Sequence, residues 1–381
     1  MSSAPPNAAG GSLRTSILVG VACLLVYNAI PAHEALRAEG WTLIEGRSPW
    51  EVAVTLDLPA SGRRAAALLE QHQEPAGYWP TSYTSATRFE RSSHEMNTFL
   101  TSTLVDLLQP VAADAGLGAA VGRARSHLTA QIEGGGLVRY HGLPDGPTIG
   151  WLGCIISPDA DDTALVWRIA PAPNPDLLRK ALATLGEYRG TDGLYWTWLA
   201  PRDRYQCIDP GSNPNPADVV IQMHVLLLLA QADPPASGAL CRALSRVVDE
   251  DRVWIYYRMA PLVPILRQAD LEKAGCTLSL PATRLRASVP GQDEWVAAAT
   301  LLRRFAGRNE PPPDAQETLA LLRKLATDDF AYVRANPPLL YHNDLTASVP
   351  RFYWSEDFGY ALWLRLFYEQ AHRHLASRGG I

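Results

Sequence analysis

The chain has 381 residues, of which 47% are apolar. Only 19% are charged, against about 25% in a typical soluble domain, so much of the chain can be buried. The formal net charge is −5, from 34 basic and 39 acidic residues, and the basic residues form no run. Because phosphate binding needs clustered Lys and Arg, we expect no nucleic acid partner.

The N-terminal region differs from the rest of the chain. Residues 1–13 are small and polar, as in a disordered tail, and an apolar run from Ile17 to Ala32 follows. The run is short for a bilayer span of about 20 residues, and it lacks the A-x-A site of a cleaved signal peptide. It can be an uncleaved anchor, an interfacial helix or a helix packed on the following domain. We favour the anchor, which predicts a membrane-associated protein facing the cytoplasm. The predicted division is a tail with its apolar helix at 1–40 and one domain at 41–381.

From about Gly62 onward the pattern is helical. Apolar residues recur every three or four positions in several segments, Arg64–Gln71, Thr98–Leu108, Leu177–Tyr188, Val219–Ala230, Trp295–Phe305, Thr318–Leu325 and Tyr360–Tyr368. The segment Val219–Ala230 is apolar nearly all round, which is typical of a helix buried on every side. The sequence therefore predicts two concentric layers of helices.

A weak repeat runs through this helical pattern. The first copy is Arg64-Ala65, Leu69, Gln73, Gly77 and Trp79. The same spacing recurs as Lys180-Ala181, Leu185, Arg189, Gly193 and Tyr195, and less completely as Arg123-Ala124, Leu128, Ile132 and Gly136. Self-similarity at a fixed spacing indicates stacked structural units, here a helix, a Gly turn and an aromatic side chain.

The most specific feature is the run from Ser157 to Leu165, which contains Asp159, Asp161 and Asp162. Ser157 as N-cap, Pro158 at the first helical position and acidic residues in the first turn are what any helix start favours. A second interpretation is chemical. If these carboxyl groups are buried together, repulsion and desolvation keep at least one of them protonated at neutral pH, as a catalytic acid requires.

Two motifs carry a resemblance to a known family. Gln73, Gly77 and Trp79 match the QW motif, Q-x-x-x-G-x-W, and Asp159–Ala164 matches D-x-D-D-T-A. Together they resemble squalene-hopene cyclases and related class II terpene cyclases. The chain departs from the family at Leu68, where an aromatic residue is usual. The resemblance implies an all-α fold, a single (α/α)6 toroid. Since the second helical domain of the larger cyclases is missing, single-domain meroterpenoid cyclases are the nearer comparison.

The resemblance also implies a mechanism. Asp161 protonates an alkene of a hydrophobic isoprenoid substrate, and Asp159 and Asp162 are its hydrogen-bonding neighbours. No metal or cofactor is needed. His224 and Gln222 are the only polar residues in Val219–Ala230. His224 is either a satisfied core histidine or the histidine with which triterpene cyclases tune the acid.

A carbocation must be shielded from water and stabilised by aromatic faces. The candidates for the cavity wall are Trp151, Trp167, Trp196, Trp198, Phe352, Tyr353 and Trp354. The pair Trp196 and Trp198 and the cluster Phe352–Trp354 are favoured, because both are expected at turns near helix starts. Trp254, Tyr256, Tyr257, Tyr360 and Trp363 are further aromatic residues whose default role is core packing.

Other polar residues are interpreted as helix caps. Asn215 and Asp218 are expected to cap the helix that starts at Val219, and Glu356 and Asp357 the last helix. Glu95 follows Ser92 by three residues, as in a capping box.

The five cysteines, Cys23, Cys154, Cys207, Cys241 and Cys276, are odd in number and show no CxxC spacing. Neither a disulfide framework nor a zinc site is expected, and a reducing compartment fits this pattern.

Two related classes fail on their motifs. A class I terpene synthase needs D-D-x-x-D, whereas Asp328 and Asp329 are followed by no third carboxylate. A protein prenyltransferase β-subunit needs D-x-C for zinc, and here only the reversed Cys207-Ile208-Asp209 occurs. A carbohydrate-active helical barrel and a non-catalytic toroid that binds a lipid or a partner stay open as alternatives.

Overall fold

The computed structural model describes residues 58–143, 155–204, 215–307 and 310–378. The chain from Ala60 to Ile381 forms one compact unit. The predicted anchor Ile17–Ala32 and the predicted boundary at residue 40 lie outside the described residues. Within the described ranges, no helix has both the length and the apolar character needed to cross a membrane.

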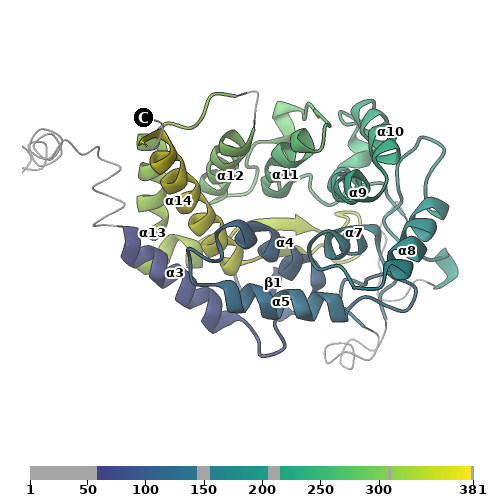
Figure 1. The fold of residues 1–381 in the computed structure, drawn as a ribbon, viewed down its shortest axis with the longest axis horizontal. Helices are drawn as coiled ribbons and strands as arrows, with labels where there is room; N and C mark the ends of the chain where they lie inside the picture. Colours follow the sequence, from purple (N-terminus) through teal and green to yellow (C-terminus); the bar gives the residue numbers. More distant parts are fainter. Residues whose placement is uncertain (1–57, 144–154, 205–214, 308–309, 379–381) are drawn as a thin grey trace, which may run out of the picture. The chain divides into compact units, whose positions relative to one another are not determined.

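Most of the described chain is helical, as expected (Figure 1). The helices are α3 (Leu58–His72), α4 (Thr98–Leu108), α5 (Gly118–Ala130), α7 (Ala160–Ile169), α8 (Pro175–Glu187), α9 (Val219–Ala232), α10 (Pro234–Ser245), α11 (Leu262–Lys273), α12 (Asp293–Ala306), α13 (Ala315–Ala335) and α14 (Glu356–Arg378). Short 3₁₀ helices are η2 (Gln109–Val111), η3 (Arg202–Arg204), η4 (Asp251–Val253) and η5 (Ala282–Arg284). Every predicted helical segment coincides with one of these helices, and only Leu177–Tyr188 extends beyond its helix, by the C-cap residue Tyr188.

The helices pack in a closed order. Helix α4 contacts α7, α7 contacts α9, α9 contacts α11, α11 contacts α12, α12 contacts α14, and α14 returns to α4. Helices α5, α8, α10 and α13 pack against members of this cycle (Figure 1). The helical fold with two layers is therefore present, while the sixfold count of the toroid stays a prediction.

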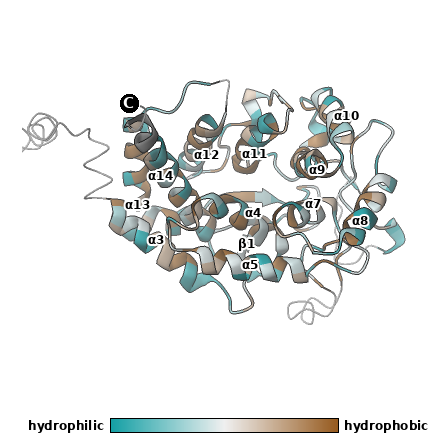
Figure 2. Cartoon of the chain, in the orientation of Figure 1, coloured by the Kyte–Doolittle hydropathy of each residue, from teal (hydrophilic) through white to brown (hydrophobic). Residues whose placement is uncertain are grey.

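Helix α9 shows why the sequence predicted an inner layer. Every residue from Val219 to Leu229 is buried, and the helix is coloured as strongly hydrophobic in Figure 2. Each fully buried Leu or Val side chain contributes about 1.5–3 kcal/mol relative to an exposed one. Asp218 caps the helix by accepting a hydrogen bond from the Val220 N–H at 3.0 Å, as predicted. Asn215 is not the cap. Its side chain accepts a hydrogen bond from the Trp198 N–H and donates one to the Trp198 carbonyl.

The expectation of an all-α fold is wrong in one respect. A four-stranded antiparallel sheet joins β1 (Thr81–Thr84), β2 (Ser93–Glu95), β3 (Leu339–His342) and β4 (Phe352–Trp354) in the order β2-β1-β4-β3. Strands of three or four residues are too short to show alternation in the sequence. Glu95 therefore belongs to a strand rather than a capping box, and Phe352–Trp354 form a strand rather than a turn.

The repeat has a common geometry in its first two copies. In the first, Gln73 Nε2 donates to the Gly77 carbonyl at 3.0 Å, and Trp79 Nε1 donates to the Leu69 carbonyl at 2.8 Å. In the second, Arg189 Nε donates to the Gly193 carbonyl at 3.1 Å, so Arg189 replaces the lost Gln.

Glycine is required at the turn of these units. Gly77 has a φ of +99°, and a Cβ there would lie 2.7 Å from the Arg123 carbonyl oxygen. A side chain would therefore meet both left-handed strain and a backbone clash.

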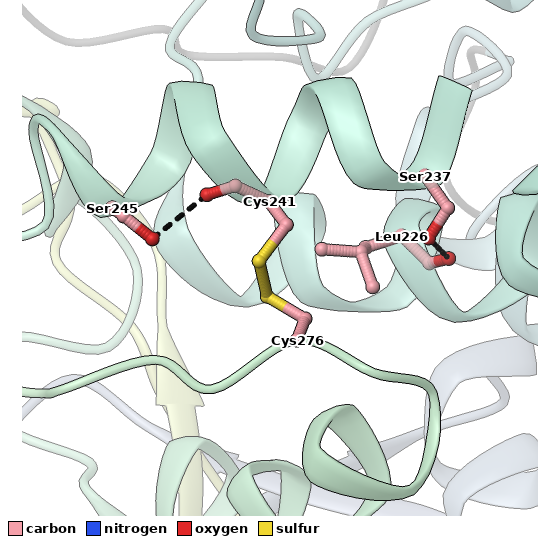
Figure 3. The surroundings of a disulfide bond; sticks show 5 residues. All are labelled: Leu226, Ser237, Cys241, Ser245 and Cys276. Atoms are coloured by element: carbon pink, nitrogen blue, oxygen red, sulfur yellow. Dashed lines mark hydrogen bonds between the residues drawn. A yellow bond between two sulfur atoms is a disulfide. The ribbon is translucent and has the colours of Figure 1, made fainter. Parts of the chain in front are cut away.

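The cysteines behave differently from the prediction. Cys241 of α10 and Cys276, which follows α11, form a disulfide (Figure 3). The two residues are 35 positions apart, so no motif in the sequence indicates the pairing. The expectation of free cysteines is wrong for this pair. The other three cysteines lie outside the described residues.

We expect the disulfide to stabilise the fold measurably. In the chain-entropy description, a crosslink that closes a loop of this size contributes about 3–4 kcal/mol. The Cys241→Ser, Cys276→Ser double variant should unfold at lower denaturant concentration than the wild type, and reductant should lower the wild-type midpoint to a similar value. Equal midpoints for both proteins, with and without reductant, would contradict the pairing.

Candidate active site

The acidic motif lies at the start of α7, where Asp159 is the N-cap. Its Oδ1 accepts a hydrogen bond from the Asp162 N–H at 2.7 Å. The expected cap Ser157 and the expected first helical residue Pro158 instead precede the helix in extended chain. Asp161 and Asp162 therefore occupy the first turn, where the helix dipole favours negative charge.

The segments that follow two Gly turns hold this helix start in place. The Asp159 N–H donates to the Val138 carbonyl at 3.2 Å, and the Ala160 N–H donates to the Thr197 carbonyl at 2.8 Å. Val138 comes two residues after Gly136, and Thr197 four residues after Gly193. The repeat thus positions the acidic motif directly.

All three carboxyl groups border one cavity of about 290 Å³. Its wall also contains aromatic residues, Phe99, Tyr140, Trp198, Tyr256, Tyr257, Tyr341 and Tyr353. A further part of the wall comes from β3 and the segment between β3 and β4, with His342, Asn343, Asp344, Ser348, Val349 and Arg351. Asp161 is 9% exposed, the largest value of the three acids, and the other two are buried still further.

Burial raises the pKa of all three acids. Desolvation raises the pKa of Asp161 from 3.8 to about 7, although the nearby Arg267 lowers it in part. Desolvation and the charge of Asp161 also raise the pKa of Asp162 to about 7, and the Thr98 hydroxyl opposes this by donating to Asp162 Oδ1 at 2.6 Å. The pKa of Asp159 is raised well above its usual range by burial and by both neighbours. The cavity therefore holds carboxylic protons at neutral pH.

His224 of α9 is bonded on both ring nitrogens. Its Nδ1 is hydrogen-bonded to Asp161 Oδ1, and its Nε2 lies 3.0 Å from Arg267 Nε. A guanidinium can only donate, so Nε2 accepts and the ring proton of neutral His224 sits on Nδ1. Burial, with the charges of Arg267 and Arg168, lowers the pKa of His224 well below its usual value. His224 is therefore a neutral donor to Asp161.

A buried ion cluster fixes Arg267 behind His224. Arg267 Nη1 bonds both Asp106 and Asp270, the latter at 2.8 Å, and Asp106 also accepts a bidentate pair from Arg168. Although burial opposes ionisation, the two guanidinium groups hold the pKa of Asp106 well below its usual range. Among the described residues, no group of His, Cys, Asp or Glu side chains is arranged to hold a metal ion.

The sheet supplies two of the aromatic residues of the wall, Tyr341 and Tyr353. Tyr353 of β4 pairs with Tyr83 on one side and Tyr341 on the other. The Tyr341 and Tyr353 rings are stacked with centroids 4.5 Å apart, and Phe99 meets Tyr341 edge-on at 4.8 Å. Tyr140 donates to the buried Glu95 at 2.6 Å and is hydrogen-bonded to the Tyr341 hydroxyl, which orders the wall.

No family model and no curated protein matches the sequence. Among solved structures, a variant of the type II terpene cyclase MstE from Scytonema, in complex with geranylgeranyl dihydroxybenzoate (substrate), matches with a TM-score of 0.54. The identity is 14%, over 82% of this chain and 97% of that chain. A second MstE variant, in complex with merosterolic acid A (product), gives a TM-score of 0.52 with the same identity and coverage. The chain has the fold of a type II terpene cyclase.

A weaker structural match is an unsaturated glucuronyl hydrolase specific for heparin. Its TM-score is 0.44, at 12% identity over 83% of this chain and 97% of that chain.

In this cyclase fold, the residues predicted for the cavity wall divide into two groups. Trp198 and Tyr353 border the cavity. The others described do not: Trp196 is 42% exposed, Trp167 donates its indole N–H to the Gly136 carbonyl, and Phe352 and Trp354 pack in a separate cluster of buried residues. Trp151 lies outside the described residues.

The sequence interpretation missed several members of the site. Phe99, Tyr140 and Tyr341 were not among the candidates, nor were Glu95 as the acceptor of the Tyr140 hydroxyl and Arg267 behind His224. Only Arg267 carried a usable signal, since it is a charged residue within the mostly apolar segment Leu262–Leu271. Asp329 lies away from the cavity and pairs with exposed Arg64.

Proposed function

We propose that the protein is a class II terpene cyclase in which Asp161 is the general acid. The observation that carries the proposal is the position of Asp161, a buried acid with a pKa of about 7 at the edge of an aromatic cavity. An alkene is a very weak base, so its protonation needs an acid that stays un-ionised until the substrate is bound.

In the proposed reaction, the Asp161 carboxyl proton is added to one carbon of an alkene, and the other carbon becomes a cation. Successive double bonds attack this cation and close rings. The last cation loses a proton, or it captures water and the bound water then loses a proton to give an alcohol. If it loses a proton, the product is an isomer of the substrate.

The groups around Asp161 hold its proton before the transfer and stabilise the charges that form after it. Burial keeps the proton on the acid before transfer. After transfer, the His224 N–H donates to the new carboxylate, and the charge of Arg267 stabilises it through the ring. The faces of Phe99, Tyr257 and Tyr341 can stabilise the migrating positive charge by cation–π contact.

Deuterium labelling tests the proposal directly. Asp161 exchanges its acidic proton with solvent between turnovers, so a reaction in D₂O should place one deuterium on the carbon that is protonated first. Geranyl, farnesyl and geranylgeranyl hydroquinones serve as probes, with cyclic products detected by mass spectrometry and their label located by NMR. We expect cyclic product with one carbon-bound deuterium, and activity that survives a chelator.

Two outcomes would reject the proposal. Cyclic product without deuterium would mean that another event starts the cascade. Loss of activity on chelation, with recovery on adding Mg²⁺, would mean that a metal ion rather than the Asp161 proton starts the reaction.

We also propose that the protein works at a membrane surface, because a long isoprenoid partitions into lipid and the run Ile17–Ala32 can bind there. About ten apolar side chains, each contributing about 1.5–3 kcal/mol when buried, suffice for this. Full-length protein should pellet with membranes after a salt wash, and a version starting at Gly40 should shift to the supernatant. Equal distribution of the two forms would exclude the anchor.

A further inference from the structure

The cavity has a second polar feature besides the acidic motif. Asp344, in the segment between β3 and β4, borders the same space as Asp161 and is only 6% exposed. Its Oδ1 accepts from the Thr346 N–H at 2.8 Å and from the Thr346 hydroxyl at 2.7 Å. Its Oδ2 is buried and accepts no hydrogen bond from any described residue. Folded proteins rarely leave a buried acceptor without a donor.

The neighbours of Asp344 already have partners. His342 Nε2 accepts from the Met259 N–H, and its Nδ1 donates to the Asn343 carbonyl. The Asn343 amide donates to the Val349 carbonyl and accepts from the Arg351 N–H. Asp159 Oδ2 is the other buried carboxyl oxygen of the described wall without such a donor, and it belongs to the acidic motif. Asp344 Oδ2 is therefore the acceptor that a substrate head group can use.

The charges around the cavity limit what this head group can be. Its described wall contains four carboxyl groups, from Asp159, Asp161, Asp162 and Asp344, but one guanidinium, from Arg351. His342 adds no positive charge at neutral pH, because burial lowers its pKa to about 4. A diphosphate is recognised by several Arg or Lys groups, and the described wall supplies only one.

We propose that Asp344 binds the head group of the substrate, and that this head group is a neutral hydroxyl rather than a diphosphate. The inference rests on the proposed cyclase function, since it places the head group opposite the alkene that Asp161 protonates. The hydroxyl donates its proton to Asp344 Oδ2 in a hydrogen bond. Asp344 therefore selects isoprenoid alcohols or phenols and sets the orientation of the chain.

The variant Asp344→Asn separates this role from the local turn. Asn keeps the Oδ1 acceptor for Thr346 but replaces Oδ2 by an N–H donor. Asp314→Asn is the matched control, because exposed Asp314 accepts from the Gln316 N–H in the same way and lies away from the cavity. Both substitutions are made in the Asp161→Asn background, so that the ligands are bound without being consumed.

Binding is measured by tryptophan fluorescence, since Trp198 borders the cavity. The probes are geraniol, farnesol and geranylgeraniol with their methyl ethers and diphosphates. We expect the best alcohol to bind more tightly than its ether and its diphosphate. Asp344→Asn should weaken alcohol binding about tenfold or more and leave ether binding unchanged, because only the alcohol has a hydroxyl proton to donate to Asp344 Oδ2. Asp314→Asn should change neither.

Three results would overturn the proposal: tighter binding of the diphosphate, equal weakening of alcohol and ether, or no binding of any alcohol. The labelling experiment judges cyclisation separately. Labelled product together with equal binding of alcohol and ether would keep the proposed function and remove this subsite. Alcohol binding that depends on Asp344, without labelled product, would keep the subsite and reject the proposed cyclase function.

Discussion

Asp161→Asn should reduce the formation of cyclic product by at least about a thousandfold. The Asn side chain keeps the shape of Asp161 and its acceptor for the His224 N–H, but it has no carboxylic proton to transfer. Loss of a general acid alone removes about 10²–10⁴ of rate, and no other proton source replaces it for a base as weak as an alkene. The measurement is product formed per hour, with circular dichroism to verify the fold.

The matched control is Asp357→Asn. Asp357 is also a buried aspartate with a raised pKa, and it is also paired with a histidine, His72, at 2.8 Å. It lies at the start of α14 and does not border the cavity. Its variant should keep near wild-type turnover. Equal loss in both variants would show that buried Asp–His pairs serve the fold here, and Asp161 would lose its assignment.

The variant Asp161→Asn should also change the pH dependence of stability, which can be measured without substrate. An unfolded aspartate has a pKa near 3.9, whereas that of folded Asp161 is raised to about 7. Between these values the folded protein holds a proton that the unfolded chain has lost, so the free energy of unfolding decreases as pH rises, by up to about 1.4 kcal/mol per pH unit. Asp161→Asn removes this contribution. Its melting temperature relative to wild type should therefore be higher at pH 8 than at pH 5.

How far the fold could be predicted depends on the length of its elements. Helix α9 was evident because eleven successive buried residues, Val219 to Leu229, leave almost no polar position. The sheet was not, since Phe352–Trp354 is a three-residue strand whose partners lie far away in the sequence. Local pattern cannot indicate such pairing. The disulfide was missed for the same reason, because Cys241 and Cys276 meet through the packing of α10 beside the chain after α11.

The site was predictable where chemistry is concentrated in a short segment. Asp159, Asp161 and Asp162 are close in sequence, and the structure also brings His224 to Asp161 across 63 positions. The aromatic wall was largely missed. An isolated Tyr140 or Tyr341 has no distinctive neighbours in sequence. The sheet register places Tyr341 beside Tyr353, and a hydrogen bond between hydroxyl groups joins Tyr140 to Tyr341. Tryptophans were overvalued: of those predicted for the wall, Trp167 bonds the Gly136 carbonyl, Trp354 bonds the Thr84 hydroxyl, and Trp196 is exposed.

Replacing His224 by Asn and by Gln should separate its two hydrogen bonds. An Asn amide reaches the place of Nδ1 and can still donate to Asp161, but it loses the contact with Arg267. A Gln amide reaches the place of Nε2 and keeps a contact with Arg267, but it cannot donate a hydrogen bond to Asp161. If the donor to Asp161 is what matters, His224→Gln should lose about 10²–10³ in turnover, as when one donor to a developing anion is removed, and His224→Asn should lose clearly less.

The pH profile distinguishes this role from a purely structural one. Donation from His224 favours the ionised form of Asp161, so its loss should raise the pKa of Asp161. Turnover requires protonated Asp161 and falls on the alkaline side as that proton is lost. In His224→Gln this fall should therefore move to higher pH while the maximal rate decreases, and in His224→Asn it should stay near the wild-type position. Equal losses of turnover in both variants, with an unmoved alkaline limb, would mean that His224 only fills the core between α7 and α9. Asp161 would then act without a tuning partner, and burial alone would set its acidity.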